Sequence, residues 1–153
     1  MKILVDADAC PVKKIIVEQA KRRRIPVTML IDTSHELDDG YSTVIMVDKG
    51  ADSVDYALMC LLTRDDLVVT QDFGLAAMAL GKGAKAINQN GLVYTDDNIE
   101  RLLFERHLSQ KIRHGGGRTR GPAKRTRDDD GRFAAALEAL LSVNEEPKAE
   151  EYR

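Results

Sequence analysis

The sequence predicts an α/β fold with three layers, α/β/α, in which helices cover both faces of a mostly parallel central sheet. Two observations support this. Short aliphatic runs, typical of strands that are buried on both faces, recur along residues 1–112. Segments with apolar residues at helical spacing separate most of these runs, and this alternation is typical of parallel strands joined by crossover helices. With 153 residues, the chain is long enough for one domain with one hydrophobic core.

Five aliphatic runs are predicted to be strands. The first, KILVD, leads into a strand-to-helix turn at residues 8–10, and Pro26 marks the start of the second. The carboxyl ends of parallel strands meet at one edge of the sheet, which is where ligands bind in folds of this class. The predicted strands are residues 2–6, 27–31, 43–48, 67–70 and 84–88.

Helices are predicted between these strands and after the last one. Pro11 fits the first turn of the first helix, because the N–H that proline lacks has no partner there. The last of these segments is amphipathic, and Thr95 or Asp96 is a suitable cap for it. The predicted helices are residues 11–24, 50–64, 74–83 and 95–112, so that residues 1–112 form the α/β domain.

The composition changes after this domain. Residues 113–130 are rich in Gly and Arg and are predicted to form a flexible basic loop. Residues 131–142 are predicted to form a C-terminal helix that docks on the core through Phe133 and neighbouring leucines. Residues 143–153 are mostly polar and are predicted to be a disordered tail.

Charge and composition restrict the partners. The formal net charge of −2 predicts no global attraction to nucleic acid, so such binding must depend on a local basic patch. No apolar run reaches the roughly 20 residues of a membrane span, and the start of the chain lacks the pattern of a secretory signal. We therefore expect a cytoplasmic protein without a membrane partner, with Cys10 and Cys60 as free thiols. The sequence leaves monomer and homodimer open.

Five acidic residues are predicted to share the carboxyl edge of the sheet. Asp6 and Asp8 follow the first strand, Asp72 follows the fourth, and Asp52 and Asp55 share a face at the start of a helix. Because we expect them to gather there without interleaved Lys or Arg, their mutual repulsion raises their pKa values unless a cation lies between them. Oxygen ligands without His or Cys favour Mg²⁺ or Mn²⁺, and such an ion suits the hydrolysis of phosphate esters.

Most of these acids also have a purely structural interpretation. Asp52 is a suitable helix cap, Asp8 lies where a helix dipole stabilises an anion, and Asp72 is a suitable turn residue before Gly74. Asp6 directly follows ILV, so its carboxylate is expected to be partly buried and to need a partner. The metal prediction therefore rests on the joint occurrence of acids at strand ends.

The basic residues of the Gly-rich loop suit contacts with phosphates, which position nucleic acid without reading its sequence. We therefore predict nucleic acid as the partner, with substrate positioned by Arg118, Arg120, Lys124, Arg125 and Arg127. Tyr41 and Tyr56 are candidates for stacking on bases, and ordinary packing is the alternative for both.

Three blocks of the sequence resemble the YaiI/YqxD family of uncharacterised bacterial proteins, which is similar to a branch of the PIN-like superfamily. The blocks are ILVDADACPV, KGADSVDYALMCLLTRDDLVVTQDFGLA and RTRGP, and the resemblance covers about residues 1–140. It implies a PIN-like three-layer α/β/α fold and activity as a Mg²⁺- or Mn²⁺-dependent nuclease, with RNA favoured over DNA as the substrate.

The resemblance also implies a role for each acid. Asp6, Asp55 and Asp72 correspond to the catalytic, metal-binding acids of the superfamily, and Asp8 and Asp52 are implied as further metal ligands.

By the same resemblance Thr70, the T of TQD, is expected to orient a metal-bound water or a phosphate. A further acid in the middle of many PIN nucleases has no clear counterpart in this sequence. The candidates for it are Glu36, Asp38, Asp39 and Asp48.

Two other functions are compatible with parts of the sequence. The first is a nucleic-acid-binding protein that has the fold and the basic loop but no catalysis. The second is a phosphatase of the haloacid-dehalogenase type, in which Asp6 would be the nucleophile and Asp8 the general acid/base. ILVDAD fits the start of such enzymes, whereas their later paired-acid motif, GDxxxD or GDxxxxD, is replaced here by TQDFGLA.

Overall fold

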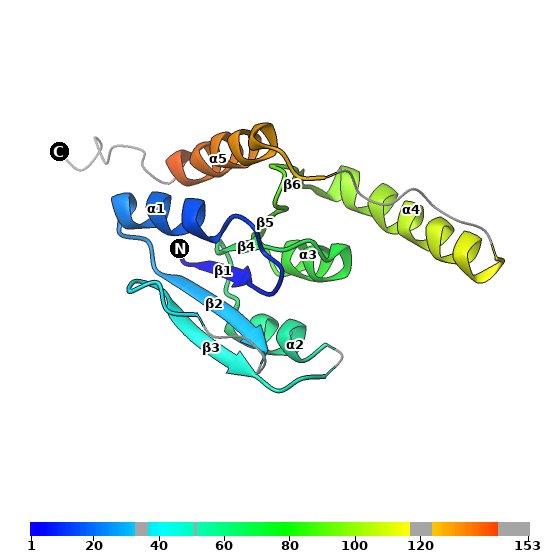
Figure 1. Ribbon diagram of the computed structural model, residues 1–153, viewed down its shortest axis with the longest axis horizontal. Coiled ribbons are helices and arrows are strands. Elements are labelled where there is room, and N and C mark those ends of the chain that lie inside the picture. Colours follow the sequence, from blue (N-terminus) through cyan, green and yellow to red (C-terminus); the bar gives the residue numbers. More distant parts are fainter. Residues whose placement is uncertain (33–36, 51, 117–123, 144–153) are drawn as a thin grey trace.

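The computed structural model describes residues 1–32, 37–50, 52–116 and 124–143. A six-stranded sheet lies between two layers of helices (Figure 1). The three-layer α/β/α class that follows from alternating aliphatic and amphipathic segments is therefore confirmed.

The sheet has the strand order β3-β2-β1-β4-β5-β6. Its first five strands are parallel, and β6 pairs antiparallel with β5 at one edge. The order reverses between β1 and β4, and in folds of this class such a switch point opens a crevice beyond the carboxyl ends of the two strands. The strands are β1 (Ile3–Asp6), β2 (Val27–Asp32), β3 (Thr43–Val47), β4 (Leu67–Val69), β5 (Lys85–Ile87) and β6 (Val93–Tyr94).

The five longer strands agree with the predicted segments to within one residue at each end. Strand β6 was not predicted, because two residues are too few to show a periodicity. It lengthens the sheet on the side of β4 and β5, away from the switch point, and so does not alter where the site is expected.

Two helices cover one face of the sheet and three cover the other. Helices α1 (Lys13–Arg23) and α5 (Arg127–Ser142) pack on the first face. Helices α2 (Ser53–Leu61), α3 (Phe73–Gly81) and α4 (Asp96–His114) pack on the second.

Several helix boundaries differ from the predicted ones, and α2 is three residues shorter than predicted at each end. Helix α1 begins after an N-cap at Val12, so Pro11 precedes the helix and does not lie in its first turn. The reason is a tight turn in which the Cys10 N–H donates to the Ala7 carbonyl at 3.2 Å. Helix α4 ends two residues later than predicted, and α5 begins four residues earlier, where Thr126 forms a capping box.

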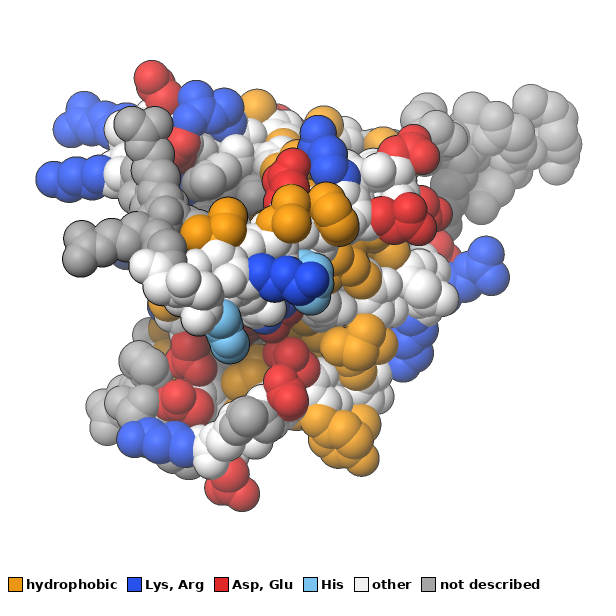
Figure 2. Space-filling model, turned by 90° about the vertical axis from the view of Figure 1, so that its right-hand side faces the viewer, with side chains coloured by type: hydrophobic (Ala, Val, Ile, Leu, Met, Phe, Trp, Pro, Cys, Tyr) orange, Lys and Arg blue, Asp and Glu red, His pale blue; other side chains and the backbone are white. Residues whose placement is uncertain are grey.

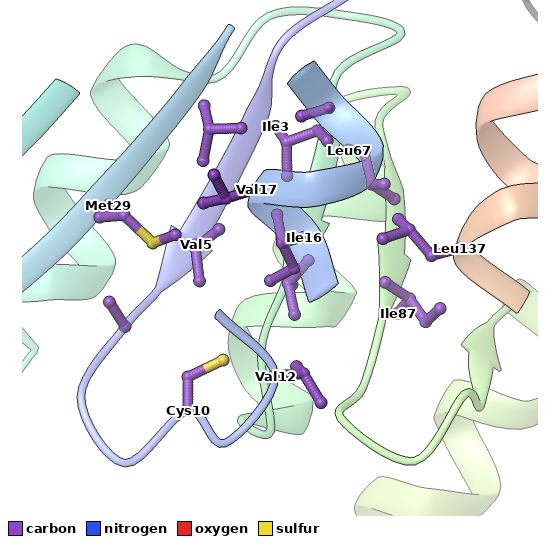
Figure 3. Close-up of a cluster of buried hydrophobic side chains, with 14 of the residues drawn as sticks. Ile3, Val5, Cys10, Val12, Ile16, Val17, Met29, Leu67, Ile87 and Leu137 are labelled. Carbon is purple, nitrogen blue, oxygen red and sulfur yellow. The ribbon is translucent and has the colours of Figure 1, made fainter. Parts of the chain in front are cut away.

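Alternate residues of the central strand β1 contribute to two separate cores. Ile3 and Val5 contact the first helical layer, where Leu137 of α5 is fully buried (Figure 3). Leu4 points to the opposite face and packs in a second cluster with Leu75 of α3. Burying each such side chain contributes roughly 1.5–3 kcal/mol, so β1 is held from both sides, and its last residue has a fixed position.

Helix α4 projects beyond the sheet (Figure 1). It has 19 residues and is therefore about 28 Å long. Ile99 near its start is buried, whereas Phe104 and Leu108 further along are 59% and 43% exposed. No helix among the described residues is long and apolar enough to cross a membrane. Both cysteines are free, as predicted.

Candidate functional site

Asp6 ends β1 at the switch point of the sheet. It lies beside Leu30 in the parallel ladder with β2. Its side chain is half-buried, and its Oδ2 accepts a hydrogen bond of 3.1 Å from the hydroxyl of Thr70, which follows β4. This bond joins the two strands between which the strand order reverses, so Asp6 lies at the edge where a ligand site was expected.

Thr70 positions two of the acids. Its side chain is 2% exposed, and the hydroxyl that donates to Asp6 also accepts from the backbone N–H of Asp72 at 3.0 Å. The hydroxyl therefore fixes the end of β1 relative to the start of α3. Its predicted contact with a metal-bound water or a phosphate remains a prediction.

Asp72 is the N-cap of α3. Its Oδ1 accepts from the backbone N–H groups of Gly74 and Leu75 at 2.8 and 3.2 Å. The structural interpretation of this residue, as a local turn and cap, is therefore observed. These bonds use only one carboxylate oxygen, and Oδ2 takes no part in them.

Asp52 and Asp55 lie at the start of α2. Asp52 occupies the N-cap position, but its side chain makes no capping hydrogen bond, and its backbone lies in the left-handed region with φ of 65°. Capping, the alternative considered from the sequence, therefore does not account for the Asp52 side chain. Asp55 follows in the first turn of the helix.

Two adjoining hollows bring the three acidic segments together. The first hollow, of about 380 Å³, is lined by Asp6, Asp8 and Asp72. The second hollow, of about 550 Å³, is lined by Asp52, Asp55 and again Asp72. We call this region the acidic edge and define it by these five residues. Figure 2 shows the molecule from this side, with acidic side chains gathered below the centre and hydrophobic side chains beside them.

Burial and mutual repulsion disfavour the charged forms of these acids. The pKa of Asp6 is raised to about 6, first by burial and then by the charges of Asp55, Asp72 and Asp8. Burial also raises the pKa of Asp55, and the charges of Asp72 and Asp52 add to this shift. The repulsion predicted from the sequence is therefore present among residues of all three segments.

Arg106 is a cation that the sequence analysis missed. It comes from α4, lines both hollows, and places its guanidinium 3.6 Å from Oδ1 of Asp72. The expectation that no Lys or Arg lies among the acids is therefore wrong in three dimensions. Arg106 is one of many charged residues on a long helix, and its approach to α3 depends on how the two helices pack, which the sequence pattern does not encode.

Asp8 has a further role in the loop after β1. Its Oδ2 accepts the backbone N–H of Asp32 at 3.0 Å and so ties this loop to the end of β2. The neighbouring Ala9 has φ of 59°, and its carbonyl accepts from the side-chain amide of Gln71 at 3.1 Å. The loop after β1 is thus connected to the end of β2 and to the loop after β4, beside the first hollow.

The predicted basic loop is only partly described. Arg118 and Arg120 lie outside the described residues, and Lys124 and Arg127 are exposed. Arg125 instead has structural contacts: it pairs with Asp130 at 2.7 Å and donates to the carbonyl of Gln89 and the side chain of Asn90. These contacts hold the start of α5 against the turn between β5 and β6.

The described candidates for a further acid do not join the acidic edge. Glu36 lies outside the described residues. The side chains of Asp38 and Asp39 accept backbone N–H groups within their own turn, and Asp48 follows β3 and is exposed. None of the three lines either hollow.

The donor chemistry of the acidic edge fits Mg²⁺ or Mn²⁺, because carboxylate and hydroxyl oxygens are hard ligands. Within the described part of the chain, no group of three or more His, Cys, Asp and Glu side chains is arranged to hold a metal ion by itself. An ion here would thus have few protein ligands and keep several waters, as Mg²⁺ commonly does when bound by one or two carboxylates.

Comparison with known proteins gives matches along nearly the whole chain. The model of a family described as uncharacterised, the YaiI/YqxD family, matches residues 4–143. A "UPF0178 protein" of Ruminiclostridium cellulolyticum is 64% identical over 95% of this chain and 94% of its own length. A second, from Clostridium acetobutylicum, is 53% identical over 92% of this chain and 97% of its own length. No solved structure gives a significant match.

Proposed function

The chain belongs to the uncharacterised YaiI/YqxD family, and from the acidic edge of its sheet we propose that it is a Mg²⁺- or Mn²⁺-dependent phosphodiesterase acting on nucleic acid, on RNA in preference to DNA. One observation carries the proposal. Asp6, Asp55 and Asp72 come from three separate segments and meet at the switch point of a mostly parallel sheet, beside the guanidinium of Arg106.

The electrostatics support a cation among these acids. Burial and the repulsion of neighbouring carboxylates both disfavour the ionised forms of Asp6 and Asp55 at neutral pH. A divalent ion would offset both effects. Asp6, Asp55 and Oδ2 of Asp72 would hold it directly or through water, with Asp8 and Asp52 assisting. When bound, such an ion polarises a phosphoryl oxygen and lowers the pKa of a bound water.

In this proposal, Thr70 and Arg106 position the acids and the substrate. Thr70 orients the carboxylate of Asp6 and the start of α3 through its two hydrogen bonds. Arg106 is 47% exposed, and its planar guanidinium suits a phosphate oxygen pair as well as it suits Asp72. A phosphodiester would thus be held between a cation of the protein and the carboxylate-bound ion, which is the arrangement that stabilises developing charge on phosphate.

The proposal extends to the superfamily. The acids at the end of β1, in the first turn of α2 and at the start of α3 are those that the sequence resemblance matches to the acids of PIN-like nucleases. We therefore propose that the family belongs to the PIN-like superfamily. Arg125 stabilises the fold and does not contact the substrate in this proposal, because its guanidinium donates to other residues of the protein.

A cleavage assay tests the proposal. End-labelled single-stranded RNA is incubated with the protein in Mn²⁺, in Mg²⁺ and in EDTA, beside the variants Asp6→Asn and Asp65→Asn. Asp65 is exposed and lies at the opposite edge of the sheet, immediately before Asp66 and β4, so it is a matched control. We expect metal-dependent cleavage that Asp6→Asn lowers by at least about 100-fold and that Asp65→Asn leaves unchanged.

The other outcomes separate the alternatives. Absence of metal-dependent cleavage above the Asp6→Asn background would falsify the proposal. RNA binding without cleavage, weakened by salt, would then favour a non-catalytic nucleic-acid-binding protein. Turnover of small phosphomonoesters with an acyl phosphate on Asp6 would favour a phosphatase of the haloacid-dehalogenase type.

A further inference from the structure

The second hollow differs from the first in having a mostly apolar floor. Tyr56 and Met59 of α2 face Leu75 and Met78 of α3 across it. Tyr56 is 75% exposed and Met78 is 46% exposed. Large side chains this exposed contribute little to the core, and the residue of α2 that is fully buried is Leu58.

Tyr56 also differs from the other tyrosines of the described chain. Tyr41 is half-buried and donates its hydroxyl to the carbonyl of Ile25. Tyr94 is 2% exposed and donates to the carbonyl of Thr70. Both therefore have a structural task. The ring of Tyr56 lies at the surface, directly after Asp55 in the sequence, and lines a hollow that contains Asp72.

We propose that the second hollow is a nucleobase subsite, in which a base next to the reacting phosphate of a single-stranded nucleic acid stacks on Tyr56. This inference rests on the proposed function and specifies its substrate class. A volume of about 550 Å³ is within the usual range of small-molecule sites of roughly 300–1,000 Å³ and accommodates one nucleotide.

The lining of the hollow fits a base. An aromatic ring binds the face of any base, and each such stack contributes about 1–3 kcal/mol without reading sequence. The flexible, polarizable thioethers of Met59 and Met78 adapt to bases of different shape. The substrate predicted by this lining is therefore tolerant of sequence.

The charges around the hollow fix the direction of the nucleotide. Arg106 is the cation among the residues that line the two hollows and lies where the second hollow meets the first, whereas Asp52 and Asp55 line the second hollow alone. The phosphate is thus expected beside Arg106 and Asp72, and the base toward Tyr56. Bases of a duplex are paired and stacked and are not available to such a pocket, so single strands are favoured.

Binding measurements test this without requiring cleavage. A fluorescein-labelled single-stranded oligonucleotide with non-cleavable phosphate linkages is titrated with the wild-type protein, Tyr56→Phe and Tyr56→Ala, and its anisotropy is followed. We expect Tyr56→Phe to keep the Kd within about twofold, because the ring remains, and Tyr56→Ala to raise it about tenfold. Phe104→Ala, which removes an exposed aromatic ring that lines neither hollow, is the matched control and leaves the Kd unchanged.

A photochemical measurement locates the base directly. The oligonucleotide carries one 5-iodouridine, and irradiation of the complex is expected to link it to Tyr56, as read by mass spectrometry of the digested protein. A duplex of the same sequence is expected to give no such link. An unchanged Kd for Tyr56→Ala, an equal loss for Tyr56→Phe, links only to other residues, or no binding of single strands overturns the subsite.

The two proposals fail separately. Binding that depends on Tyr56 together with the absence of metal-dependent cleavage removes the nuclease and retains the subsite. Cleavage that requires Asp6 but is indifferent to Tyr56→Ala retains the nuclease and removes the subsite.

Discussion

Two carboxylates, Asp66 and Asp6, connect the same two strands at opposite ends. Asp66 precedes β4 and binds Lys2, which precedes β1, with an ion pair of 2.6 Å. It also accepts the backbone N–H of Lys2 and both the N–H and the hydroxyl of Thr63. Asp6 ends β1, and among the described residues its carboxylate accepts one hydrogen bond, from the hydroxyl of Thr70.

The difference appears in their pKa values. Hydrogen bonds from Lys2 and Thr63 outweigh burial and hold the pKa of Asp66 below its usual value. For Asp6, burial and neighbouring acids outweigh one hydrogen bond, and the pKa is raised to about 6. A buried acid surrounded by donors serves the fold, whereas an acid surrounded by other acids opposes it and needs another explanation, such as a ligand.

The largest effect on stability is expected from Asp66→Asn. Its amide would face donors with a donor of its own and leave Lys2 without its ion pair, so we expect a loss of about 3 kcal/mol in the free energy of unfolding. Urea unfolding at pH 7 measures this, with Asp65→Asn as control, expected within about 0.5 kcal/mol of wild type. A loss no greater than that of the control contradicts a structural role for Asp66.

The same variant has a defined pH dependence. A lowered folded pKa means that the contribution of Asp66 is fully present above the unfolded value of 3.8 and is lost as the pH falls through the folded value. The stability difference between wild type and Asp66→Asn should therefore shrink in acid.

Asp6→Asn is expected to change stability in the opposite direction. Because the folded pKa of about 6 exceeds the unfolded 3.8, the contribution of Asp6 to stability is greatest below pH 4 and is lost as the pH rises through 6. The variant should be more stable than wild type above pH 6, on the order of 1–2 kcal/mol after allowance for solvent screening at a half-buried site. The two proteins should converge below pH 4, as measured by urea unfolding across this range.

Adding Mg²⁺ or Mn²⁺ is expected to change the thermal stability of wild type but not that of Asp6→Asn. Bound ion favours the folded state, so at pH 8 the Tm of wild type should rise and that of Asp6→Asn should not. Equal shifts in both proteins would mean that the ion binds elsewhere.

The smallest effect is expected from Thr70→Val, which keeps the shape of the side chain but removes the hydroxyl shared by Asp6 and the Asp72 N–H. We expect a loss of about 1 kcal/mol. Because the hydrogen bond from Thr70 lowers the pKa of Asp6, that pKa should rise above 6. A ¹³C NMR titration of the Asp6 carboxyl measures it, and Thr70→Ser, which keeps the hydroxyl, should titrate like wild type.

The sequence predicted what depends on local pattern. Aliphatic runs located five of six strands, and the rule for parallel sheets brought Asp6, Asp55 and Asp72 to one edge. The acid that holds the opposite edge was not recognised, because TRDDL offers Asp65 and Asp66 equally and only the packed sheet makes the second one buried.

The roles of two further residues, Arg106 and Arg125, could not be predicted because they depend on tertiary packing. Arg106 lies on a helix of mixed charge, and its contact with Asp72 follows from the way α4 packs on α3. Arg125 was predicted to contact substrate because it lies in a basic stretch, yet its donors bind residues that are distant in the sequence. In both cases the residue that binds the arginine belongs to a different helix or turn, which the local sequence pattern does not reveal.

The strand order also determines when the site can form. Asp6 and Thr70, which face each other across β1 and β4, are separated by 64 residues. Closing so long a loop is entropically costly and slow compared with pairing β1 with β2. In a partly folded chain in which β4 has not yet paired with β1, the five acids are therefore present but lie apart. The phosphodiesterase activity that we propose would therefore be acquired only when β4 is in place.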